Sequence, residues 1–364
     1  MDLDAVRAKL LKKYGAAKVD SELLSHIPYG ISTQSLQLDL AIGRPGVPAG
    51  RVVQILGIDG VGKSTIVHHL CAEALLLDGY VISLDAEQAI DESRAYHMGF
   101  DVNSERVLSL MPYTLEELFG MAGMAIKEVA SVRESPDIPI LVAIDSLDGL
   151  PTMAQRERED AEDKFVAAAS RVINDHLPAL LLTASQEKAT MVFVSQLTTK
   201  FGGGWRPGFA GPEYDTRGGL GIKYRASLRI QVKRGPFLGD SKDDRPGFTN
   251  KIEIIKNKVA PPFKKCEYDM LFESGIDKYS DLFEAGQVIR LISGGGGGRY
   301  TVKLKKAEHH IYKKEWPKLV DDQGGPDKFR KRMTRTAIRR GFLKPYGQVA
   351  EQPPAESEAE KDPS

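Results

Sequence analysis

Between residues 51 and 194 the chain alternates short apolar runs with longer segments in which apolar residues recur at helical spacing. Apolar runs of about four to eight residues are typical of strands buried in a sheet, and the longer periodic segments are typical of amphipathic helices. The predicted strands are Arg51–Leu56, Tyr80–Leu84, Arg106–Leu110, Ile138–Ile144 and Met191–Val194. The predicted helices are Lys63–Leu77, Thr114–Ala130 and Phe165–Glu187. This order predicts a three-layer α/β domain with a mostly parallel central sheet and helices on both faces.

The pattern changes after residue 194. Three later segments alternate apolar and polar residues with no long helix between them, as antiparallel strands do. They are Tyr224–Val232, Lys251–Lys258 and Glu267–Phe272, and we expect them to extend the parallel sheet. At the other end of the chain, Asp2–Leu24 predicts a charged amphipathic helix.

Five consecutive glycines within Ser293–Gly298 predict a hairpin tip or a flexible joint. Beyond them the pattern predicts a small basic α+β domain, and then a tail rich in Pro, Glu and Ala whose composition predicts disorder. We therefore expect four parts: an N-terminal helix and linker (residues 1–29), a core (30–277), a small C-terminal domain (278–345) and an acidic tail (346–364).

Charge is unevenly distributed, although the 364 residues carry no formal net charge. From Arg299 to Lys344 there are fifteen Lys and Arg against five Asp and Glu, whereas Glu351–Ser364 holds five acids and one Lys. A basic domain followed by an acidic tail is typical of proteins that bind polyanions. A solvated basic surface with a solubilising tail fits the same counts.

Composition argues against several other classes of protein. The two cysteines, Cys71 and Cys266, are too few for a disulfide framework, and neither belongs to a metal-ligand spacing. No stretch reaches the roughly 20 apolar residues that a membrane-spanning helix needs. Residues Met1–Leu11 lack the apolar core of a signal peptide. These features predict a cytoplasmic protein.

A glycine-rich segment between the first predicted strand and the helix after it fits the pattern G-x-x-x-x-G-K-[ST]. In such a loop successive backbone N–H groups face the phosphates of a nucleotide, at the positive end of a helix. We expect Lys63 to reach the β- and γ-phosphates of ATP and the Ser64 hydroxyl to hold Mg²⁺. The predicted ATP contacts of this segment are Gly57, Ile58, Asp59, Gly60, Val61, Gly62, Lys63, Ser64 and Thr65.

Three polar residues follow predicted strands whose carboxyl ends meet at one edge of the sheet. Asp145 is expected beside Ser64, where it would bind or position Mg²⁺, although a capping Asp has the same pattern. Glu87 would polarise the water that attacks the γ-phosphate, or it would simply belong to a helix start. The amide of Gln196 suits a γ-phosphate sensor, and a strand-end Gln without that role gives the same signal.

The predicted loop Leu197–Gly219 is long and contains seven glycines, which is unusual for a passive connection. Basic groups neutralise phosphates and aromatic side chains contact bases, so its composition favours nucleic-acid binding over a plain connection. Because the loop follows Gln196 directly, movement of that amide toward a γ-phosphate would reorganise it. The residues concerned are Lys200, Phe201, Trp205, Arg206, Phe209, Tyr214 and Arg217.

Taken in order, these segments resemble the RecA-type recombinases of bacteria and phages. The resemblance covers residues 30–286 and is carried by Gly57–Ser64, Leu84–Glu87, Ile144–Ser146, Phe193–Gln196 and Ile255–Phe263. Its most specific part is Lys256-Asn257-Lys258, which general arguments about ATPases do not predict. The resemblance implies a RecA-type P-loop ATPase core, and an N-terminal helix that packs on the next subunit.

The resemblance also implies roles for the matching residues. Glu87 would be the general base, and Gln196 would couple ATP to the DNA-binding loop. Lys256 and Lys258 would reach the γ-phosphate held by the neighbouring subunit and act as an arginine finger does, so hydrolysis would depend on assembly. Further matches place Asp91 at adenine, Tyr224 at the subunit interface, and Gly218 and Gly219 beside the DNA-binding loop.

A first DNA-binding loop would fall within Gly149–Lys164, where Arg156 and Arg158 are the residues expected to contact DNA. The chain departs from the family at two points of the nucleotide site. Asp59-Gly60 differs from the commoner choice in the phosphate loop, and Arg94 stands where an aromatic residue often stacks on adenine.

The sequence therefore predicts an ATP-dependent homologous recombinase that acts in DNA repair. Its filaments would bind single-stranded DNA with ATP and Mg²⁺, pair it with a homologous double-stranded DNA, and hydrolyse ATP between subunits. Two alternatives use the same core: a hexameric helicase, and a non-catalytic mediator of recombination.

Overall fold

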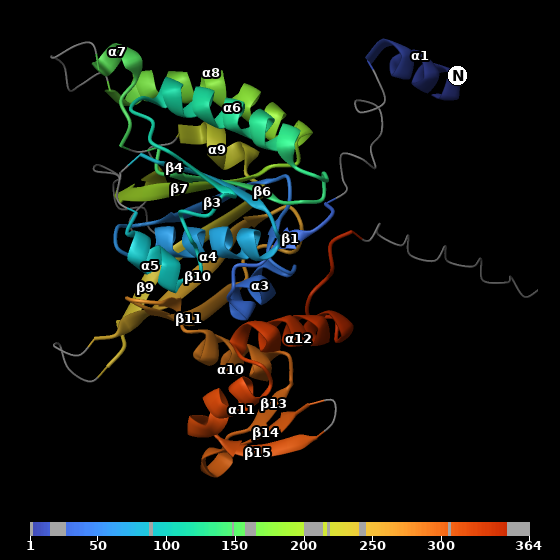
Figure 1. Cartoon of the computed structure of the whole chain (residues 1–364), viewed down its shortest axis with the longest axis vertical. Coiled ribbons are helices and arrows are strands. Elements are labelled where there is room, and N and C mark those ends of the chain that lie inside the picture. The colour runs from blue at the N-terminus through green and yellow to red at the C-terminus, as the bar shows by residue number, and fades with distance from the viewer. Residues whose placement is uncertain are drawn as a thin grey trace, which may run out of the picture.

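In the computed structural model of the chain, the described residues are 3–14, 27–86, 90–147, 149–156, 165–199, 214–216, 219–239, 245–304 and 307–347. Figure 1 shows a large body built around a twisted sheet, with a smaller group of helices and strands beneath it. Helix α1 (Leu3–Tyr14) covers the first part of the predicted N-terminal helix and lies away from the body. The remaining residues of that predicted helix, Asp2 and 15–24, lie outside the described part of the chain.

Six parallel strands form the centre of a ten-stranded sheet within the described residues. The strand order is β12-β11-β10-β9-β3-β7-β6-β4-β5, and β8 (Tyr214–Thr216) pairs with β7. Each crossover between consecutive parallel strands contains a helix, as a parallel connection requires. The predicted parallel sheet is confirmed. Its strands are β3 (Val52–Gly57), β4 (Tyr80–Asp85), β5 (Val107–Leu110), β6 (Ile140–Asp145), β7 (Thr190–Thr199) and β9 (Leu228–Phe237).

The antiparallel extension is present but begins one strand later than predicted. Strand β9 runs parallel to β3, with Val53 opposite Leu228, because the chain enters it through a helix, α9 (Gly219–Arg225). The expectation that a strand begins at Tyr224 is wrong, since Tyr224 lies in that helix. The antiparallel strands are β10 (Gly247–Asn257), β11 (Lys265–Leu271) and β12 (Gly275–Ile276).

The uninterrupted apolar run of β6 reflects burial on both faces of the sheet. Leu141 and Ala143 belong to the core on the side of α4, whereas Ile140, Val142 and Ile144 belong to the core on the side of α6 and α8. All five are at most 3 % exposed, as expected for a strand with helices on both sides. Figure 1 shows α3 (Leu36–Ile42), α4 (Lys63–Leu76) and α5 (Glu92–His97) on one face, and α6 (Leu115–Val132), α8 (Phe165–Gln186) and α9 on the other.

The segment after residue 277 forms most of a separate apolar core, which Leu36 and Leu40 of α3 complete. The rings of Phe283, Trp316 and Phe329 pack edge to face, with successive centroids 5.5 Å apart. Gly296–Gly298 form a short turn between two paired strands, so the predicted hairpin tip is confirmed. The elements are α10 (Lys278–Val288), β13 (Ile292–Gly294), β14 (Arg299–Lys303), β15 (Glu308–Tyr312), α11 (Trp316–Asp322) and α12 (Pro326–Arg339).

Buried polar groups join this segment to the body. Asp281 of α10 accepts hydrogen bonds from Ser35 Oγ at 2.5 Å and from the Leu36 N–H at 2.7 Å, at the start of α3. Arg330 of α12 donates to Glu73 Oε2 of α4 at 2.7 Å, and both side chains are buried. Burial raises the pKa of the Asp281 carboxyl to about 7, against the opposing effect of its hydrogen bonds. Removing one partner of a buried ion pair leaves the other charge buried and unpaired, so either substitution would weaken the contact between α12 and α4.

None of the described helices combines the length and the apolar composition of a membrane span.

Candidate nucleotide site and nucleic-acid interface

The glycine-rich segment forms a tight turn between β3 and α4. Gly60 and Gly62 have φ angles of 68° and 82°, a region that residues with a side chain rarely adopt. A Cβ atom on Gly57 would lie 2.6 Å from the Val232 carbonyl oxygen, so the neighbouring strand admits only glycine there. Gly62 precedes the first turn of α4, whose N–H groups have no intrahelical partners. The loop and the helix end therefore form a cradle suited to phosphates.

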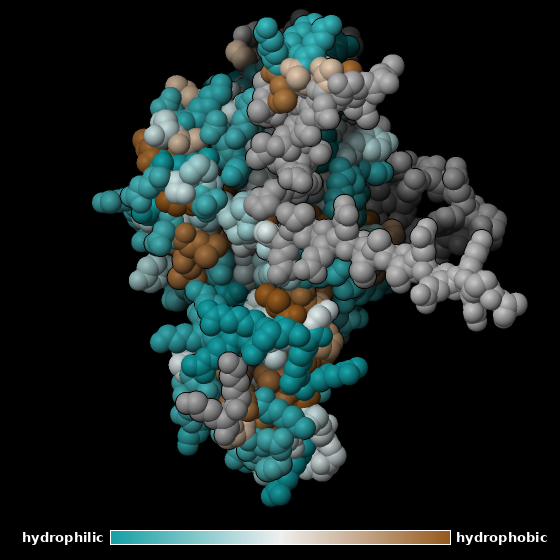
Figure 2. Space-filling model, turned by 90° about the vertical axis from the view of Figure 1, so that its right-hand side faces the viewer, coloured by the Kyte–Doolittle hydropathy of each residue, from teal (hydrophilic) through white to brown (hydrophobic). Residues whose placement is uncertain are grey.

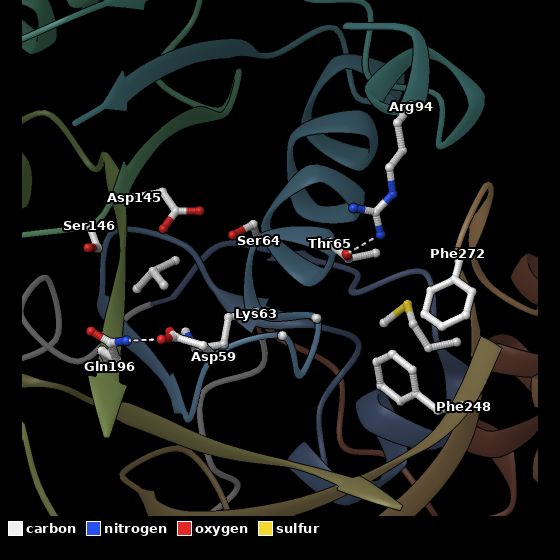
Figure 3. A pocket seen from close by; sticks show the side chains of 14 residues that line it. Asp59, Lys63, Ser64, Thr65, Arg94, Asp145, Ser146, Gln196, Phe248 and Phe272 are labelled. Atoms are coloured by element: carbon white, nitrogen blue, oxygen red, sulfur yellow. Dashed lines mark hydrogen bonds and ion pairs between the residues drawn. The ribbon is translucent and has the colours of Figure 1, made fainter. Parts of the chain in front are cut away.

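This loop forms one wall of a cavity of about 460 Å³ (Figure 3). A cavity of that size is in the range that holds nucleotide-sized ligands. One end is polar, and the other is lined by side chains of the antiparallel strands and the turn after them. The lining residues are Asp59, Gly60, Gly62, Lys63, Ser64, Thr65, Arg94, Asp145, Ser146, Val194, Gln196, Phe248, Met270 and Phe272.

The strand pairing explains the polar end of the cavity. Gly57 lies opposite Gln196 in the β3–β7 pair, and Asp145 ends β6. Both Asp145 and Gln196 line the cavity together with Ser64, and Figure 3 shows the Asp145 carboxyl pointing toward the Ser64 hydroxyl. A hydroxyl and a carboxylate are oxygen ligands of the kind that Mg²⁺ prefers. The residues present at this end therefore fit a magnesium ion.

Lys63 is held by its own loop. Its Nζ donates to the Ile58 carbonyl oxygen at 2.8 Å and lies 3.8 Å from Asp59 Oδ1. Asp59 Oδ2 in turn accepts a hydrogen bond from the Gln196 amide (Figure 3). One carboxylate thus contacts both residues that the sequence assigns to the γ-phosphate.

The other end of the cavity suits a nucleobase. Arg94 donates through one terminal nitrogen to Thr65 Oγ1 at 3.0 Å. Its Nε is buried and has no hydrogen-bond partner among the described residues, so a ligand group would satisfy it. Figure 3 shows the rings of Phe248 and Phe272 on the same side of the phosphate loop as Arg94. A guanidinium group near aromatic rings can contact the flat face of a base.

Four predicted ATP contacts are not among the residues that line the cavity: Asp91, and Gly57, Ile58 and Val61 of the phosphate loop. Asp91 is the N-cap of α5, and its side chain accepts a hydrogen bond from the Arg94 N–H at 3.0 Å. It is exposed and is not among the cavity-lining residues. Its predicted contact with adenine stays a prediction.

Lys256 and Lys258 lie at the opposite edge of the sheet from the phosphate loop. Lys256 is opposite Arg229 in the β9–β10 pair, and Arg229 is opposite Gln54, three residues before Gly57. Its Nζ donates to the carbonyl oxygens of Lys223 and Tyr224, both at 2.9 Å. Burial lowers the pKa of the Lys256 ammonium, and the nearby charges of Lys258 and Arg229 lower it further.

Two predicted DNA-contacting positions fall within the described residues. Arg156 ends α7 (Met153–Arg156); its guanidinium lies over the Tyr113 ring at 5.2 Å and 3.9 Å from Glu117 Oε1. Gly219 begins α9. The predicted site residues outside the described part of the chain are Glu87, Arg158, Lys200, Phe201, Trp205, Arg206, Phe209, Arg217 and Gly218.

The ends of the predicted DNA-binding loop are paired strands, which the sequence pattern did not reveal. Leu197, Thr198 and Thr199 of β7 pair in antiparallel register with Thr216, Asp215 and Tyr214 of β8. The hairpin begins one residue after Gln196. Gln196 and the base of this hairpin are therefore adjacent along β7.

Sequence reasoning did not name Phe248, Met270 and Phe272 as part of the nucleotide site. Phe248 is buried near the start of β10, where an aromatic residue is typical of an ordinary core. These residues reach the cavity only because β10 and β11 lie on the far side of β9 from the phosphate loop's own strand. No spacing along the chain carries that information.

Comparison with known proteins decides the family. A family model of the RecA N-terminal domain matches residues 5–277. The chain belongs to the RecA family. It is 33% identical over 297 residues to Protein RecA of Campylobacter hominis, which covers 80% of both chains. It is 31% identical over 334 residues to Protein RecA of Rickettsia africae, covering 88% of this chain and 92% of the relative. Protein RecA of a Nocardioides species is 34% identical over 300 residues, 81% of this chain and 80% of the relative.

The RecA-family similarity spans the core and reaches into the C-terminal segment. The chain is accordingly a recombinase of this family, a DNA-dependent ATPase of the P-loop type that binds DNA and forms filaments. The predicted function and fold class are confirmed. The helicase and mediator alternatives are not favoured.

Proposed function

We propose that each ATP site of this recombinase is completed by a second copy of the chain. One copy supplies the phosphate loop, and the neighbour supplies Lys256 and Lys258. The observation that carries this proposal is the position of the two groups at opposite edges of one sheet.

The distances within one copy support a role between copies. The Lys256 backbone is level with Gln54, which lies about 10 Å before Gly57 along the strand at ~3.3 Å per residue. Strand β9 separates β10 from β3, which adds about 10 Å across the sheet. The Lys256 ammonium also points to the carbonyl groups at the end of α9. A lysine in this position can contact a phosphate bound by a neighbouring copy far more readily than a phosphate bound by its own copy.

Ser64 and Asp145 are the residues that would hold Mg²⁺, which when bound neutralises charge on the phosphate oxygens. Among the described residues no group of three or more His, Cys, Asp or Glu is suited to a metal ion. That agrees with magnesium, which is usually held by one or two protein groups together with substrate phosphates and water. Lys63 would contact the same phosphates from the loop.

Glu87 is proposed as the base that takes a proton from the attacking water. The last residue of β4, Asp85, lies opposite Asp145 in the β4–β6 pair. The chain therefore leaves β4 at the edge of the sheet where the cavity lies. Gln196 would report the γ-phosphate to the β7–β8 hairpin and so link nucleotide to DNA affinity.

We further propose that the filament assembles on single-stranded DNA and pairs it with a homologous double-stranded DNA. The loop residues Lys200, Phe201, Trp205, Arg206 and Arg217, with Gly218 and Gly219, would contact the single strand, and Arg156 and Arg158 would contribute from the first loop. Contacts of this kind go mainly to the backbone, so binding should tolerate sequence and weaken with salt.

Helix α12 supports a role for residues 278–345 as a basic domain that gathers duplex DNA. Phe329, Arg330, Met333 and Ala337 are its buried residues, and its other basic residues are exposed. The lower part of the surface in Figure 2, which belongs to this segment, is mostly hydrophilic. The acidic tail, residues 346–364, would compete with DNA for this surface. The exposed basic residues are Lys328, Lys331, Arg332, Arg335, Arg339 and Arg340.

Residues 1–29 would join neighbouring subunits. Val6 and Leu11 of α1 are 44% and 37% exposed, so apolar side chains are available for a second copy. Tyr224, at the end of α9 beside Lys256, is 64% exposed and suits the same interface. Such surfaces are typical of a protein that assembles.

Electron microscopy of the full chain with single-stranded DNA, with and without ATP and Mg²⁺, tests the proposal. We expect extended helical filaments that require nucleotide, and exchange of a labelled strand with a homologous duplex in the same solution. Closed rings that unwind a duplex would support a helicase instead. Filaments without strand exchange would support a mediator.

A further inference from the structure

We infer that Asp59 of the phosphate loop is a positioning residue that determines discrimination between nucleoside triphosphates and diphosphates. Its carboxylate contacts Lys63 and Gln196, the two residues assigned to the γ-phosphate, so a triphosphate must displace it. This inference rests on the proposed nucleotide site and adds a function for a loop residue that the family pattern leaves open.

Lys63 and Gln196 share one carboxylate, that of Asp59. Asp59 Oδ2 accepts the hydrogen bond of the Gln196 amide, and Asp59 Oδ1 lies 3.8 Å from Lys63 Nζ. The pairing of Gly57 with Gln196 brings the start of the loop beside the end of β7, which makes this bridge possible. An anion therefore already contacts the two groups that would bind the terminal phosphate.

The side chains of Asp59 and Lys63 differ in their exposure to solvent. The Asp59 side chain is 78% exposed, whereas the Lys63 side chain is 10% exposed. Asp59 can turn into solvent without losing buried contacts, while Lys63 stays at the cavity wall. An ion pair whose acid lies largely in solvent is weak, because water can replace the carboxylate's contact. The carboxylate is thus the partner that leaves.

The carboxylate of Asp59 and a γ-phosphate are both negatively charged. A γ-phosphate that takes the hydrogen bonds of Lys63 and Gln196 brings negative charge close to Asp59, and like charges at short range repel. A diphosphate places its phosphates in the N–H cradle of the loop and does not compete for Gln196. Asp59 therefore weakens triphosphate binding more than diphosphate binding, and it keeps Gln196 positioned until the exchange occurs.

Calorimetric titration of the full chain without DNA tests this, with ADP and the slowly hydrolysed analogue ATPγS as probes. In Asp59→Ala we expect the ratio of the ADP dissociation constant to the ATPγS dissociation constant to rise about tenfold, the effect of losing one charge-assisted contact and its repulsion. Asp59→Asn keeps an acceptor for Gln196 but removes the charge. Its ratio of dissociation constants should lie between those of the unaltered chain and Asp59→Ala. Asp59→Glu restores a carboxylate and should return the ratio toward that of the unaltered chain.

Glu105→Gln is the matched control. Glu105 is exposed in the turn before β5, at the other edge of the sheet, and the variant loses the same single charge. Its ratio should not change. An unchanged ratio in both Asp59→Ala and Asp59→Asn, with both nucleotides still bound, would overturn the inference about Asp59 and leave the proposed nucleotide site standing. Failure of the unaltered chain to bind either nucleotide would instead overturn the proposed site.

Discussion

The two edges of the ten-stranded sheet hold their charged groups in different ways. At the carboxyl edge, Lys63, Asp145 and Gln196 line one cavity, and the Lys63 side chain is 10% exposed. At the amino edge, Lys256 and Lys258 line no part of that cavity, and Lys256 donates only to backbone carbonyl groups in the interactions described. Among the described residues, charged groups gather around the cavity at the carboxyl edge, whereas the interactions of Lys256 at the amino edge include no carboxylate.

Under the proposed function, this difference gives a physical reason for hydrolysis to depend on assembly. A parallel sheet places all its carboxyl ends on one side, so groups at the amino ends cannot join them within one domain. In the proposed arrangement, one copy's amino edge would face the next copy's carboxyl edge and bring the two sets of groups together. Such a contact would be head to tail, and contacts of that type form open helical filaments when the rotation does not close.

The largest effect should follow from removing the carboxyl-edge cation. In Lys63→Ala the cradle loses its only side-chain ammonium within the cavity's described lining, so we expect hydrolysis to fall by at least about 10³-fold. Release of inorganic phosphate with saturating single-stranded DNA measures this. Turnover near that of the unaltered chain would refute the phosphate-loop assignment.

Removing the amino-edge cation should affect turnover but spare nucleotide binding. In Lys256→Ala we expect DNA-stimulated hydrolysis to fall by about 10²–10³-fold while the ATPγS dissociation constant changes by less than about threefold. Lys251→Ala is the control, because Lys251 lies on the same strand but forms an exposed ion pair with Glu267 at 3.8 Å. It should retain turnover.

Mixing the two inactive variants tests the position of the second cation. When Lys63→Ala and Lys256→Ala chains assemble together, some interfaces combine an intact loop from one copy with an intact Lys256 from the next. Hydrolysis should reappear at those interfaces and exceed that of either variant alone. A mixture as inactive as its components would place Lys256 in the same copy as its phosphate.

The alkaline pH dependence of turnover should also distinguish the two edges. Burial, with Lys258 and Arg229 nearby, lowers the pKa of Lys256, so it loses its proton at a lower pH than an ordinary lysine. Since the charged form is required, DNA-stimulated hydrolysis should decline as pH rises. Lys256→Arg keeps its charge, so the decline should move to higher pH, whereas Lys251→Arg should leave the profile unchanged. Identical profiles for all three would exclude this titration.

The smallest expected effect is at the base end of the carboxyl-edge cavity. Arg94→Ala removes the guanidinium beside Thr65 and should weaken ATPγS binding by about fivefold, the size of one stacking or cation–π contact. Arg94→Tyr restores a flat surface and should recover much of that loss. Equal binding by all three chains in calorimetry would show that the base lies elsewhere.

Much of the fold could be predicted because its signals are local. The run of β6 is apolar on both faces, and the helices α4, α6 and α8 begin within about two residues of their predicted starts. The direction of β9 could not be predicted, because a half-exposed strand shows the same alternation in either direction. Only the short helix α9 ahead of it, missed in the pattern, decides that it runs parallel to β3.

The candidate site divides in the same way. Gly57–Ser64 is a continuous segment whose chemistry is readable from spacing, and Asp145 and Gln196 follow from the rule that parallel strands end at one edge. Phe248 and Phe272 could not be identified, since Phe248 belongs to an antiparallel strand whose pattern is that of an ordinary core and Phe272 lies in the turn after another. The hydrogen bond between Asp59 and Gln196 could not be predicted either, because the two residues are 137 positions apart in the chain.

The sequence alone determined where the phosphate loop, the strand ends and the paired lysines lie along the chain, because each is a short motif with its own local pattern. Tertiary structure decided which of them share a cavity and which face away. The physical reason is that strand pairing sets neighbours across the sheet, and pairing depends on contacts between residues far apart in the chain. The separation of Lys63 from Lys256, and the meeting of Asp59 with Gln196, both come from that pairing.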